Sequence, residues 1–294
     1  LGGCGWLDDS VLAGDMEIIA GDVTDPESVR AAMTGVDTVL HLAALIAIPY
    51  SYQAPRSYLR TNAEGTLNVL LAARDAGVRR IVHTSTSEVY GTAQRVPIDE
   101  EHPLRAQSPY AASKIAGDKL AESFACSFDL PVVTVRPFNT FGPRQSSRAV
   151  LPTIITQCLA IQRGEADVIR LGSTTPTRDL NYVEDTAAGF LAAAVAGEGC
   201  HGATLNLGTG REVSVGDIAQ SIAGIVGVNP RIETDARRVR PSGSEVERLI
   251  ADANLARDVL GWAPSVGLEE GLRRTVAWFA ERVDATARAH EYVV

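Results

Sequence analysis

The stretch Thr84-Ser85-Thr86-Ser87-Glu88-Val89-Tyr90-Gly91 decides how the rest of the chain is interpreted. It follows the run Arg80-Ile81-Val82-His83-Thr84, whose β-branched and apolar residues are typical of a buried parallel strand. Ligands of open α/β sheets bind beyond the carboxyl ends of the strands. The hydroxyl groups and the carboxylate that follow this strand are therefore predicted to lie where chemistry takes place.

A second feature follows within the next helix, which is predicted to begin at Ser108-Pro109 and to carry Tyr110 and Lys114 on one face, four residues apart. A cation beside a phenol favours the phenolate, so we expect Lys114 to lower the pKa of Tyr110. Such a tyrosine can take the proton of a hydroxyl group while a hydride leaves the carbon. A Tyr-x-x-x-Lys pair alone occurs on many helices, and a lone glutamate is usually solvated. The order of hydroxyl-rich strand end, Glu88 and Tyr-x-x-x-Lys favours catalysis.

The composition places the chain among globular proteins of ordinary hydrophobicity. Its 294 residues, 45% of them hydrophobic, suffice for one doubly wound domain with a smaller lobe. A net charge of -9 without a block of lysine and arginine argues against a nucleic-acid partner. The four cysteines are scattered, which predicts free thiols in a reducing cytoplasm. No membrane segment, signal peptide or metal site is predicted.

Strands and helices alternate along the first half of the chain. Strands are predicted at 16–20, 37–42, 80–84 and 130–136, and helices at 25–34, 57–76 and 110–128. This alternation predicts a doubly wound parallel sheet of the Rossmann type with helices on both faces. Three successive strand ends, at 42–44, 84–88 and 137–139, carry small or polar residues, so they are expected to form one site.

The second half, after Gly142-Pro143, predicts a smaller α/β lobe and the rest of the sheet. Helices are expected from 150, at 185–196, at 215–227 behind the cap Ser214, at 253–260 and at 268–283, with a tail at 284–294. Strands are expected at 168–171, around 178–183 and at 204–207. Three arginines, Arg237, Arg238 and Arg240, gather in one loop.

Five stretches resemble the extended short-chain dehydrogenase/reductase family, more narrowly its NAD-dependent nucleotide-sugar 4,6-dehydratases. They are His41-Leu-Ala-Ala-Leu-Ile-Ala-Ile-Pro-Tyr50-Ser51, Thr84-Ser-Thr-Ser-Glu-Val-Tyr-Gly91, Tyr110-Ala-Ala-Ser-Lys114, Arg136-Pro-Phe-Asn-Thr-Phe-Gly-Pro-Arg144 and Thr175-Pro-Thr-Arg-Asp-Leu-Asn-Tyr182. The resemblance is greatest to the branch that acts on nucleotide-linked N-acetylglucosamine in legionaminic acid biosynthesis.

The chain departs from this family at its start. The family opens with a strand, a Gly-x-x-Gly-x-x-Gly turn and a helix that receive the pyrophosphate, and Leu1-Gly-Gly-Cys-Gly-Trp6 does not match. We expect two strands and a helix to precede Leu1. The resemblance implies NAD, with NADP left open because the discriminating residue belongs to the same segment. It also implies a dinucleotide-binding domain at 1–148, interleaved with 179–210, and a nucleotide-sugar lobe at 149–178 and 211–294.

The resemblance implies roles for individual residues. The catalytic residues would be Thr86, Ser87, Glu88, Tyr110 and Lys114. The cofactor would contact Asp22, Val23, Leu42, Ala43, Ala44, Thr84, Tyr110, Lys114 and Pro137. The substrate would contact Tyr50, Ser51, Thr86, Asn139, Arg178 and Arg240.

Three of these roles have alternatives. Ser87 stands where dehydratases of deoxythymidine-diphosphoglucose carry an aspartate, so Glu88 is expected to serve as both base and acid. Arg178 would instead be structural if it were paired with Asp179 or Asp185, and Arg240 would instead be a solvated charge of its loop.

The expected activity is 4,6-dehydration of a UDP- or GDP-linked N-acetylglucosamine by a cytoplasmic homodimer that pairs through helices 57–76 and 110–128. A UDP-glucuronate decarboxylase is the nearest alternative. A nucleotide-sugar 4-epimerase and a cofactor-binding protein without catalysis are further ones. The sequence leaves the nucleotide and the 2-substituent of the sugar open.

Overall fold

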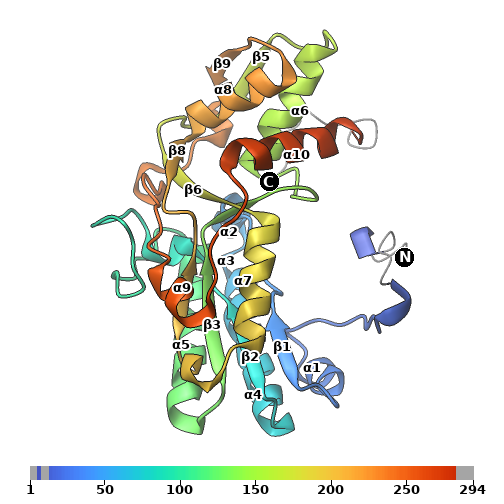
Figure 1. The fold of residues 1–294 in the computed structure, drawn as a ribbon, viewed down its shortest axis with the longest axis vertical. Helices are drawn as coiled ribbons and strands as arrows, with labels where there is room; N and C mark the ends of the chain where they lie inside the picture. Colours follow the sequence, from blue (N-terminus) through green and yellow to red (C-terminus); the bar gives the residue numbers. More distant parts are fainter. Residues whose placement is uncertain (1–4, 8–12, 283–294) are drawn as a thin grey trace.

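The central sheet consists of four parallel strands in the order β1-β2-β3-β7 (Figure 1). They are β1 (Thr38–His41), β2 (Arg80–Thr84), β3 (Val132–Pro137) and β7 (Thr204–Leu207). The computed structural model describes residues 5–7 and 13–282. Because all four strands run the same way, their carboxyl ends lie along one edge of the sheet.

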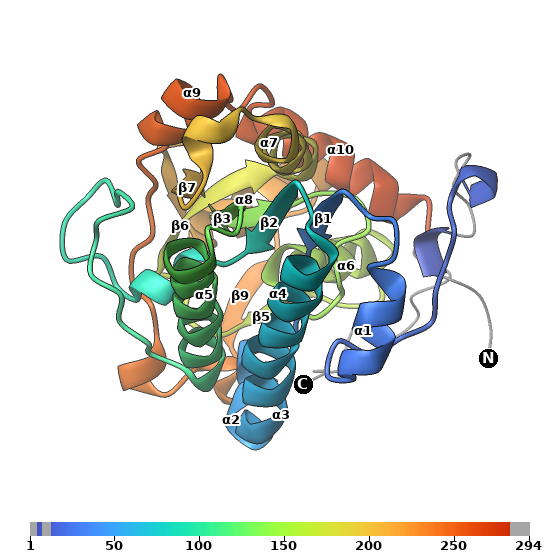
Figure 2. The same ribbon diagram turned by 90° about the horizontal axis from the view of Figure 1, so that it is seen from below.

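Helices cover both faces of this sheet, as Figures 1 and 2 show. Ile81 and Val132 are neighbours in register and pack with α1 (Pro26–Ala32), α4 (Gly65–Ala76) and α5 (Pro109–Phe128). Val82 and Val133, one residue further along, pack with α7 (Val183–Val195) and α9 (Asn254–Leu260). Alternate residues of a strand point to opposite faces. The predicted doubly wound, Rossmann-type sheet is confirmed.

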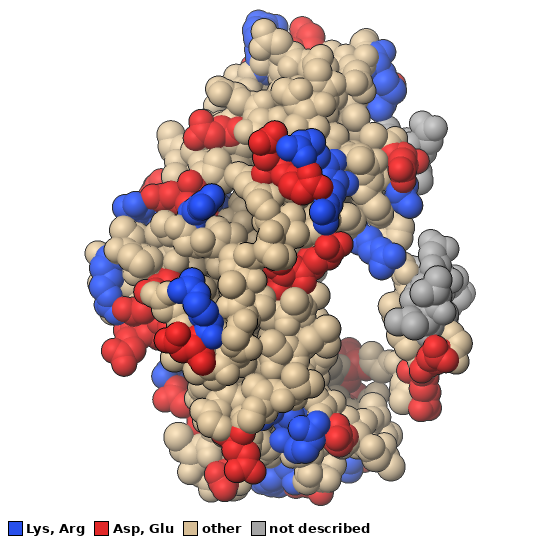
Figure 3. Space-filling view, in the orientation of Figure 1, with Lys and Arg blue, Asp and Glu red and all other residues tan. Residues whose placement is uncertain are grey.

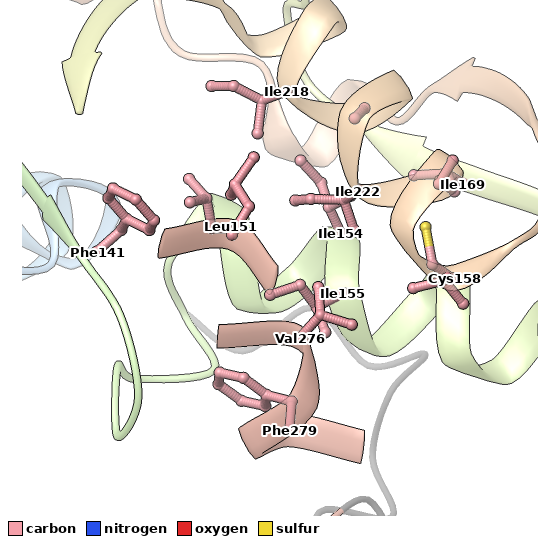
Figure 4. Close-up of a cluster of buried hydrophobic side chains, with 14 of the residues drawn as sticks. Phe141, Leu151, Ile154, Ile155, Cys158, Ile169, Ile218, Ile222, Val276 and Phe279 are labelled. Atoms are coloured by element: carbon pink, nitrogen blue, oxygen red, sulfur yellow. The ribbon is translucent and has the colours of Figure 1, made fainter. Parts of the chain in front are cut away.

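A second lobe lies beyond the carboxyl edge of the sheet, at the top of Figure 1. It contains α6 (Val150–Gln162), α8 (Val215–Val226), α10 (Leu268–Ala280) and the parallel pair β5 (Val168–Leu171) and β9 (Arg231–Thr234). Its core gathers Ile154, Ile155 and Ile222, all fully buried (Figure 4). A three-stranded sheet, β4 (Asn139–Phe141), β6 (Thr177–Tyr182) and β8 (Glu212–Ser214), contributes Phe141 and Tyr182 to this core.

The predicted helix starts are confirmed by their caps. Ser108 Oγ accepts a hydrogen bond from Ala111 N at 3.1 Å, and Pro109 occupies the first turn of α5. Ser214 caps α8 by the same interaction with Asp217 N, and Asp25 caps α1. Capping by a short polar side chain satisfies amide groups that have no partner inside the helix.

Two predicted elements differ from the structure. Residues 16–20 form no strand: Met16, Ile18 and Ile19 are exposed, and no neighbouring strand pairs with them. The predicted helix 57–76 is divided into α3 (Pro55–Tyr58), a π-helical segment Leu59–Glu64 and α4, and a short α2 (Ile48–Gln53) precedes it. Residue 283 and the predicted tail at 284–294 lie outside the described residues, as do residues 1–4.

The helices and one face of the surface can be compared with the expectations from the sequence. None of the helices in the described ranges combines the length and the apolar character that a membrane crossing requires. The face drawn in Figure 3 carries lysine and arginine interspersed with aspartate and glutamate, without a basic patch.

The close packing of α10 on the three-stranded sheet can be tested at Gly271. A Cβ atom there would lie 2.7 Å from Phe141 Cζ and 3.0 Å from Tyr182 Cδ2. We expect Gly271→Ala to lower the free energy of unfolding by about 1–3 kcal/mol through overpacking. Gly224→Ala in α8, where no atom lies within 4 Å, should instead raise it by about 0.5–1 kcal/mol. Urea unfolding of both variants measures the difference, and equal effects would contradict the packing.

Candidate active site

The site is built on the turn that follows β2. Thr86 caps a 3₁₀ turn (Ser87–Tyr90), and its Oγ1 accepts a hydrogen bond from Glu88 N at 3.2 Å. Thr86, Ser87 and Glu88 are all buried, with Glu88 8% exposed. Extended backbone at the cap followed by a tight turn brings the hydroxyl and the carboxylate close to the end of β2.

The beginning of α5 lies against this turn. Tyr110 lies close enough to the hydroxyl of Thr86 for that group to lower its pKa, and Lys114 Nζ donates to Thr84 O at 2.5 Å. Tyr110 is 7% and Lys114 3% exposed. The structure therefore brings together all five residues that were predicted to be catalytic.

The protonation of Tyr110 differs from the expectation. Burial raises the pKa of Tyr110, the hydrogen bond from Thr86 lowers it, and the charge of Glu88 raises it further. Burial also lowers the pKa of Lys114 to about 8. The prediction that Lys114 lowers the pKa of Tyr110 below its ordinary value is wrong, because desolvation of the phenolate outweighs the favourable interactions and the ammonium group is directed at Thr84 O.

Two arginines and two carboxylates face one another at the second side of the site. Glu245 Oε1 lies 3.4 Å from Arg178 Nη2 and 3.7 Å from Arg240 Nη1. Arg240 Nη1 also lies 4.0 Å from Glu88 Oε1 and has no hydrogen-bond partner although it is buried. These long distances leave donors of both guanidinium groups available to a further anion.

Arg178 is not held by either of the carboxylates considered from the sequence. Asp179 accepts hydrogen bonds from Thr209 N, Gly210 N and Ala251 N, and so fixes the loop after β7. Asp185 accepts from Ser265 Oγ and Val266 N at the start of α7. Both acids are thus structural, and burial lowers the pKa of Arg178.

Other predicted ligands lie where the strand ends meet. Thr84 Oγ1 and Asn139 Oδ1 are buried without a hydrogen-bond partner, and buried polar atoms normally have one. Leu42 and Ala43 are exposed beyond β1, Ala44 is half-buried, and Pro137 ends β3. The unpartnered hydroxyl, the small residues and Lys114 fit the nicotinamide end of a dinucleotide. The predicted adenine contacts lie in the loop before α1, where Asp22 accepts from Thr24 N and Val23 packs against Gly65.

The two residues predicted to contact the sugar from α2 have different positions. Tyr50 is 38% exposed, and its ring centroid lies 6.2 Å from that of Tyr58, which lies 6.2 Å from that of Tyr110. Ser51 is fully buried, and its hydroxyl donates to Ile48 O at 2.7 Å. The expectation that Ser51 contacts the sugar is wrong, since its hydroxyl closes a turn of its own helix.

Several residues of the site were not predicted. Glu245 is one, and it is held by Gln107 Nε2, which donates to its main-chain oxygen at 2.9 Å. Tyr52 of α2 is another, and its hydroxyl lies 2.6 Å from Ser244 Oγ. No local pattern marks these residues, because each pair joins segments more than 100 residues apart. Asp118 was also missed, although its position four residues after Lys114 places it on the same helix face.

Comparisons with known proteins agree with this geometry. A sequence model described as GDP-mannose 4,6 dehydratase matches residues 6–275. A UDP-glucose 4-epimerase of Mycolicibacterium smegmatis is 34% identical over 273 residues, which are 90% of this chain and 83% of that protein. A dTDP-glucose 4,6-dehydratase of Streptomyces griseus is 34% identical over 259 residues, or 88% and 76% of the two chains. The solved structure of a dTDP-glucose 4,6-dehydratase double mutant from Streptomyces venezuelae with NAD bound has a TM-score of 0.82 at 28% identity, covering 90% of this chain and 80% of that one.

Two buried histidines behind the site give a test of its electrostatics. His41 Nε2 lies 3.0 Å from Thr66 Oγ1, and burial, together with the charges of His83 and Lys114, lowers the pKa of His41 to about 3. Between pH 6.5 and about 3 the unfolded chain binds a proton at this residue that the folded chain does not. The contribution of His41 therefore makes the free energy of unfolding of the protein fall as the pH falls, by up to about 1.4 kcal/mol per pH unit. We expect His41→Gln to remove this part of the pH dependence of stability, as measured by thermal unfolding at pH values between 4 and 6.5. An unchanged pH dependence in the variant would contradict the assignment.

Proposed function

The chain belongs to the GDP-mannose 4,6-dehydratase family, and we propose that it is an NAD-dependent 4,6-dehydratase of a nucleotide-activated hexose. The observation that carries the proposal is the position of Glu88. This buried carboxylate lies between the Thr86–Tyr110 pair and Arg240, so one sugar ring could meet the oxidising residues and a base. Oxidation alone would not require a carboxylate at this place.

The residues divide the reaction into two parts. Bound NAD would supply the hydride acceptor for C4 of the sugar and, once reduced, the hydride donor for C6. Tyr110, as the phenolate, would take the proton of the 4-hydroxyl, Thr86 would hold the same oxygen, and the ammonium group of Lys114 would partly offset the rise that burial gives the pKa of Tyr110. The ketone formed at C4 acidifies the hydrogen at C5.

Glu88 carries the elimination that follows. It takes the C5 proton, the C6–O bond breaks, and the hydroxyl leaves as water with the proton that Glu88 returns to it. Ser87 lies in the same turn but has no acidic proton of suitable pKa, so both proton transfers fall to Glu88. A proton from solvent replaces the one lost from C5 when the hydride returns to C6.

We assign the diphosphate of the substrate to Arg178, Arg240 and Asn139. Arginine suits this role because its planar guanidinium group donates two parallel hydrogen bonds to phosphate oxygens. The unpartnered donor Arg240 Nη1 supports the assignment, and Asn139 would donate to a phosphate oxygen through its amide nitrogen. N-acetylglucosamine linked to UDP or GDP is the proposed substrate, and the exposed Tyr50 is assigned to contact the sugar.

A 4-epimerase is the second candidate, because a UDP-glucose 4-epimerase is 34% identical over 90% of the chain. An epimerase shares the oxidation at C4 and returns the hydride to the same carbon. It needs no base at C5, so the consequence of losing Glu88 separates the two activities.

The proposed reaction predicts loss of one water from the substrate. We expect this loss by mass spectrometry when the protein is incubated with NAD and UDP- or GDP-linked N-acetylglucosamine, with NADP compared in parallel. Glu88→Gln should lower the rate of water loss about 100-fold or more, since a general acid–base residue contributes that much. The exposed Glu247→Gln should not change it. A C4 epimer of unchanged mass, full turnover by Glu88→Gln, or carbon dioxide released from UDP-glucuronate would each contradict the proposal.

We also propose that two copies associate through α4, α5 and the π-helical segment between α3 and α4. A groove of about 610 Å³ lies there, lined by the apolar Leu59, Leu67 and Leu120 and by the charged Arg56, Arg60 and Glu64. Leu59 is 58% exposed. A patch that carries both apolar side chains and both charges can be complementary to itself, as a two-fold interface requires.

This interface predicts a defined effect of Leu59→Asp. Burying an unpaired carboxylate between two copies is unfavourable, so we expect the variant to be monomeric in light scattering at concentrations where the unchanged protein is dimeric. Val195→Asp on α7, which replaces a residue 77% exposed, is the matched control and should remain dimeric. A monomeric unchanged protein, or a dimeric Leu59→Asp variant, would contradict the interface.

A further inference from the structure

Asp118 occupies the same face of α5 as Tyr110 and Lys114, at successive intervals of four residues. It is 4% exposed, although aspartate is rarely buried unless it is paired. It takes part in none of the steps described above. A buried carboxylate on the catalytic face of the helix that carries the reacting tyrosine therefore requires an explanation.

The contacts of Asp118 reach both neighbouring strands. Oδ2 accepts hydrogen bonds from Ser85 Oγ at 2.8 Å and from Arg136 Nε and Nη2 at 3.1 and 2.9 Å, and Oδ1 lies 3.2 Å from His83 Nε2. Ser85 directly follows β2 and directly precedes Thr86. One carboxylate thus joins α5 to the segment that carries the hydroxyl partner of Tyr110.

The helix approaches β2 closely at this point. A Cβ atom on Gly117 would lie 3.3 Å from His83 Cε1 and 3.2 Å from Asn62 O, so a larger residue would separate the elements. Arg136 continues the connection, since its Nη1 donates to Tyr90 OH at 2.9 Å at the end of the turn that holds Glu88. The clamp formed by Asp118, Ser85, His83 and Arg136 therefore contacts both ends of the catalytic turn.

The charges around Lys114 come from several elements. Tyr110 and Asp118 lie on its own helix, His41 on β1, His83 on β2, Arg136 on β3 and Glu88 on the turn after β2. Burial lowers the pKa of both histidines, so they are neutral near pH 7. Asp118 also lines a cavity of about 660 Å³, whose other ionisable lining residues include Glu100, Glu101, His102, Lys119 and Glu122.

Among these groups Asp118 acts on the protonation of Lys114. Burial lowers the pKa of Lys114 to about 8, and the charge of Asp118 raises it. Burial alone would raise the pKa of Asp118, but the hydrogen bond from His83, the charge of Arg136 and the bond from Ser85 hold that pKa below its ordinary value. Asp118 is therefore an anion throughout the neutral pH range.

We propose that Asp118 is a positioning residue for the reaction: it aligns Tyr110 with Thr86 through the clamp, and it keeps Lys114 protonated while the phenolate forms. The proposal rests on the proposed function for its effect on rate. Its effect on the proton bound by Lys114 does not depend on any activity.

The first experiment is the pH profile of kcat for the unchanged protein, Asp118→Asn and Ser85→Ala. Activity should fall as the pH rises through the pKa of Lys114, near pH 8 in the unchanged protein. Removing an adjacent charge lowers the pKa of an ammonium group, so this alkaline limb should move down by about 1 pH unit or more in Asp118→Asn. Ser85→Ala loses one bond of the clamp but keeps the carboxylate, so its limb should stay in place even if its kcat falls.

A second measurement needs no substrate. Because the pKa of Lys114 is about 8 in the folded chain and about 10.4 in the unfolded one, the free energy of unfolding falls as the pH falls across that interval and levels off below it. In Asp118→Asn the fall should continue to lower pH, and the additional change Lys114→Met should abolish it. Asp118→Asn leaves Arg136 unpaired and could fail to fold for that reason. In that case the double variant Asp118→Asn/Arg136→Met, which lacks both charges, is compared with the single variant Arg136→Met.

The outcomes separate this proposal from the proposed function. Two results for Asp118→Asn would each overturn the role of Asp118. One is an alkaline limb of the kcat profile at the same pH as in the unchanged protein, and the other is a free energy of unfolding that levels off at the same pH. The absence of dehydration in the unchanged protein, together with the shifted unfolding curves, would support the role of Asp118 and contradict the proposed function alone.

Discussion

The position of α5 against the ends of β2 and β3 is the constraint on which the site depends. Lys114 donates to Thr84 O, Tyr110 is bonded to Thr86, and Asp118 accepts from Ser85 and Arg136. Each of these bonds is buried, where an unpaired donor or acceptor costs about 1–3 kcal/mol. The helix therefore cannot slide or turn by one residue without breaking several of them together. The need to pair every buried polar group therefore fixes the position of Tyr110. The apolar contacts between α5 and α4 stabilise the packing of the two helices.

The site joins two parts of the chain that differ in how firmly they are held. The residues proposed to be catalytic lie beside the end of β2 and on the long helix α5, where buried hydrogen bonds hold the two elements together. The arginines face Glu88 and Glu245 at 3.4–4.0 Å, which is outside good hydrogen-bonding distance. Their charges are balanced by carboxylates but their donors are not saturated. The proposed diphosphate could therefore bind these arginines without first breaking strong ion pairs.

Prediction from the sequence succeeded where the signal was local. The strands at 80–84 and 204–207 follow from short apolar runs, and α5 follows from Ser108, Pro109 and its long periodic pattern. It failed where the outcome depended on distant partners. Residues 16–20 have the composition of a strand but no strand beside them, and Glu245 meets Arg178 only because the chain returns after 67 residues. The raised pKa of Tyr110 reflects burial, which no spacing of residues reveals.

The same distinction explains why the nucleotide and the sugar substituent are harder to infer than the reaction. Proton transfer requires a few residue types at spacings that one helix and one turn can supply. The residues proposed to recognise the substrate lie on separate elements that only the folded chain brings together, namely Tyr50 and Tyr52 on α2, Asn139 on β4, Arg178 on β6 and residues 240–245. The hydroxyl groups of Tyr52 and Ser244 join two of these regions directly, so the position of α2 depends on this contact with residues 240–245. On the proposed function, a substitution in either lobe could then alter specificity without changing the proton transfers assigned to Tyr110 and Glu88.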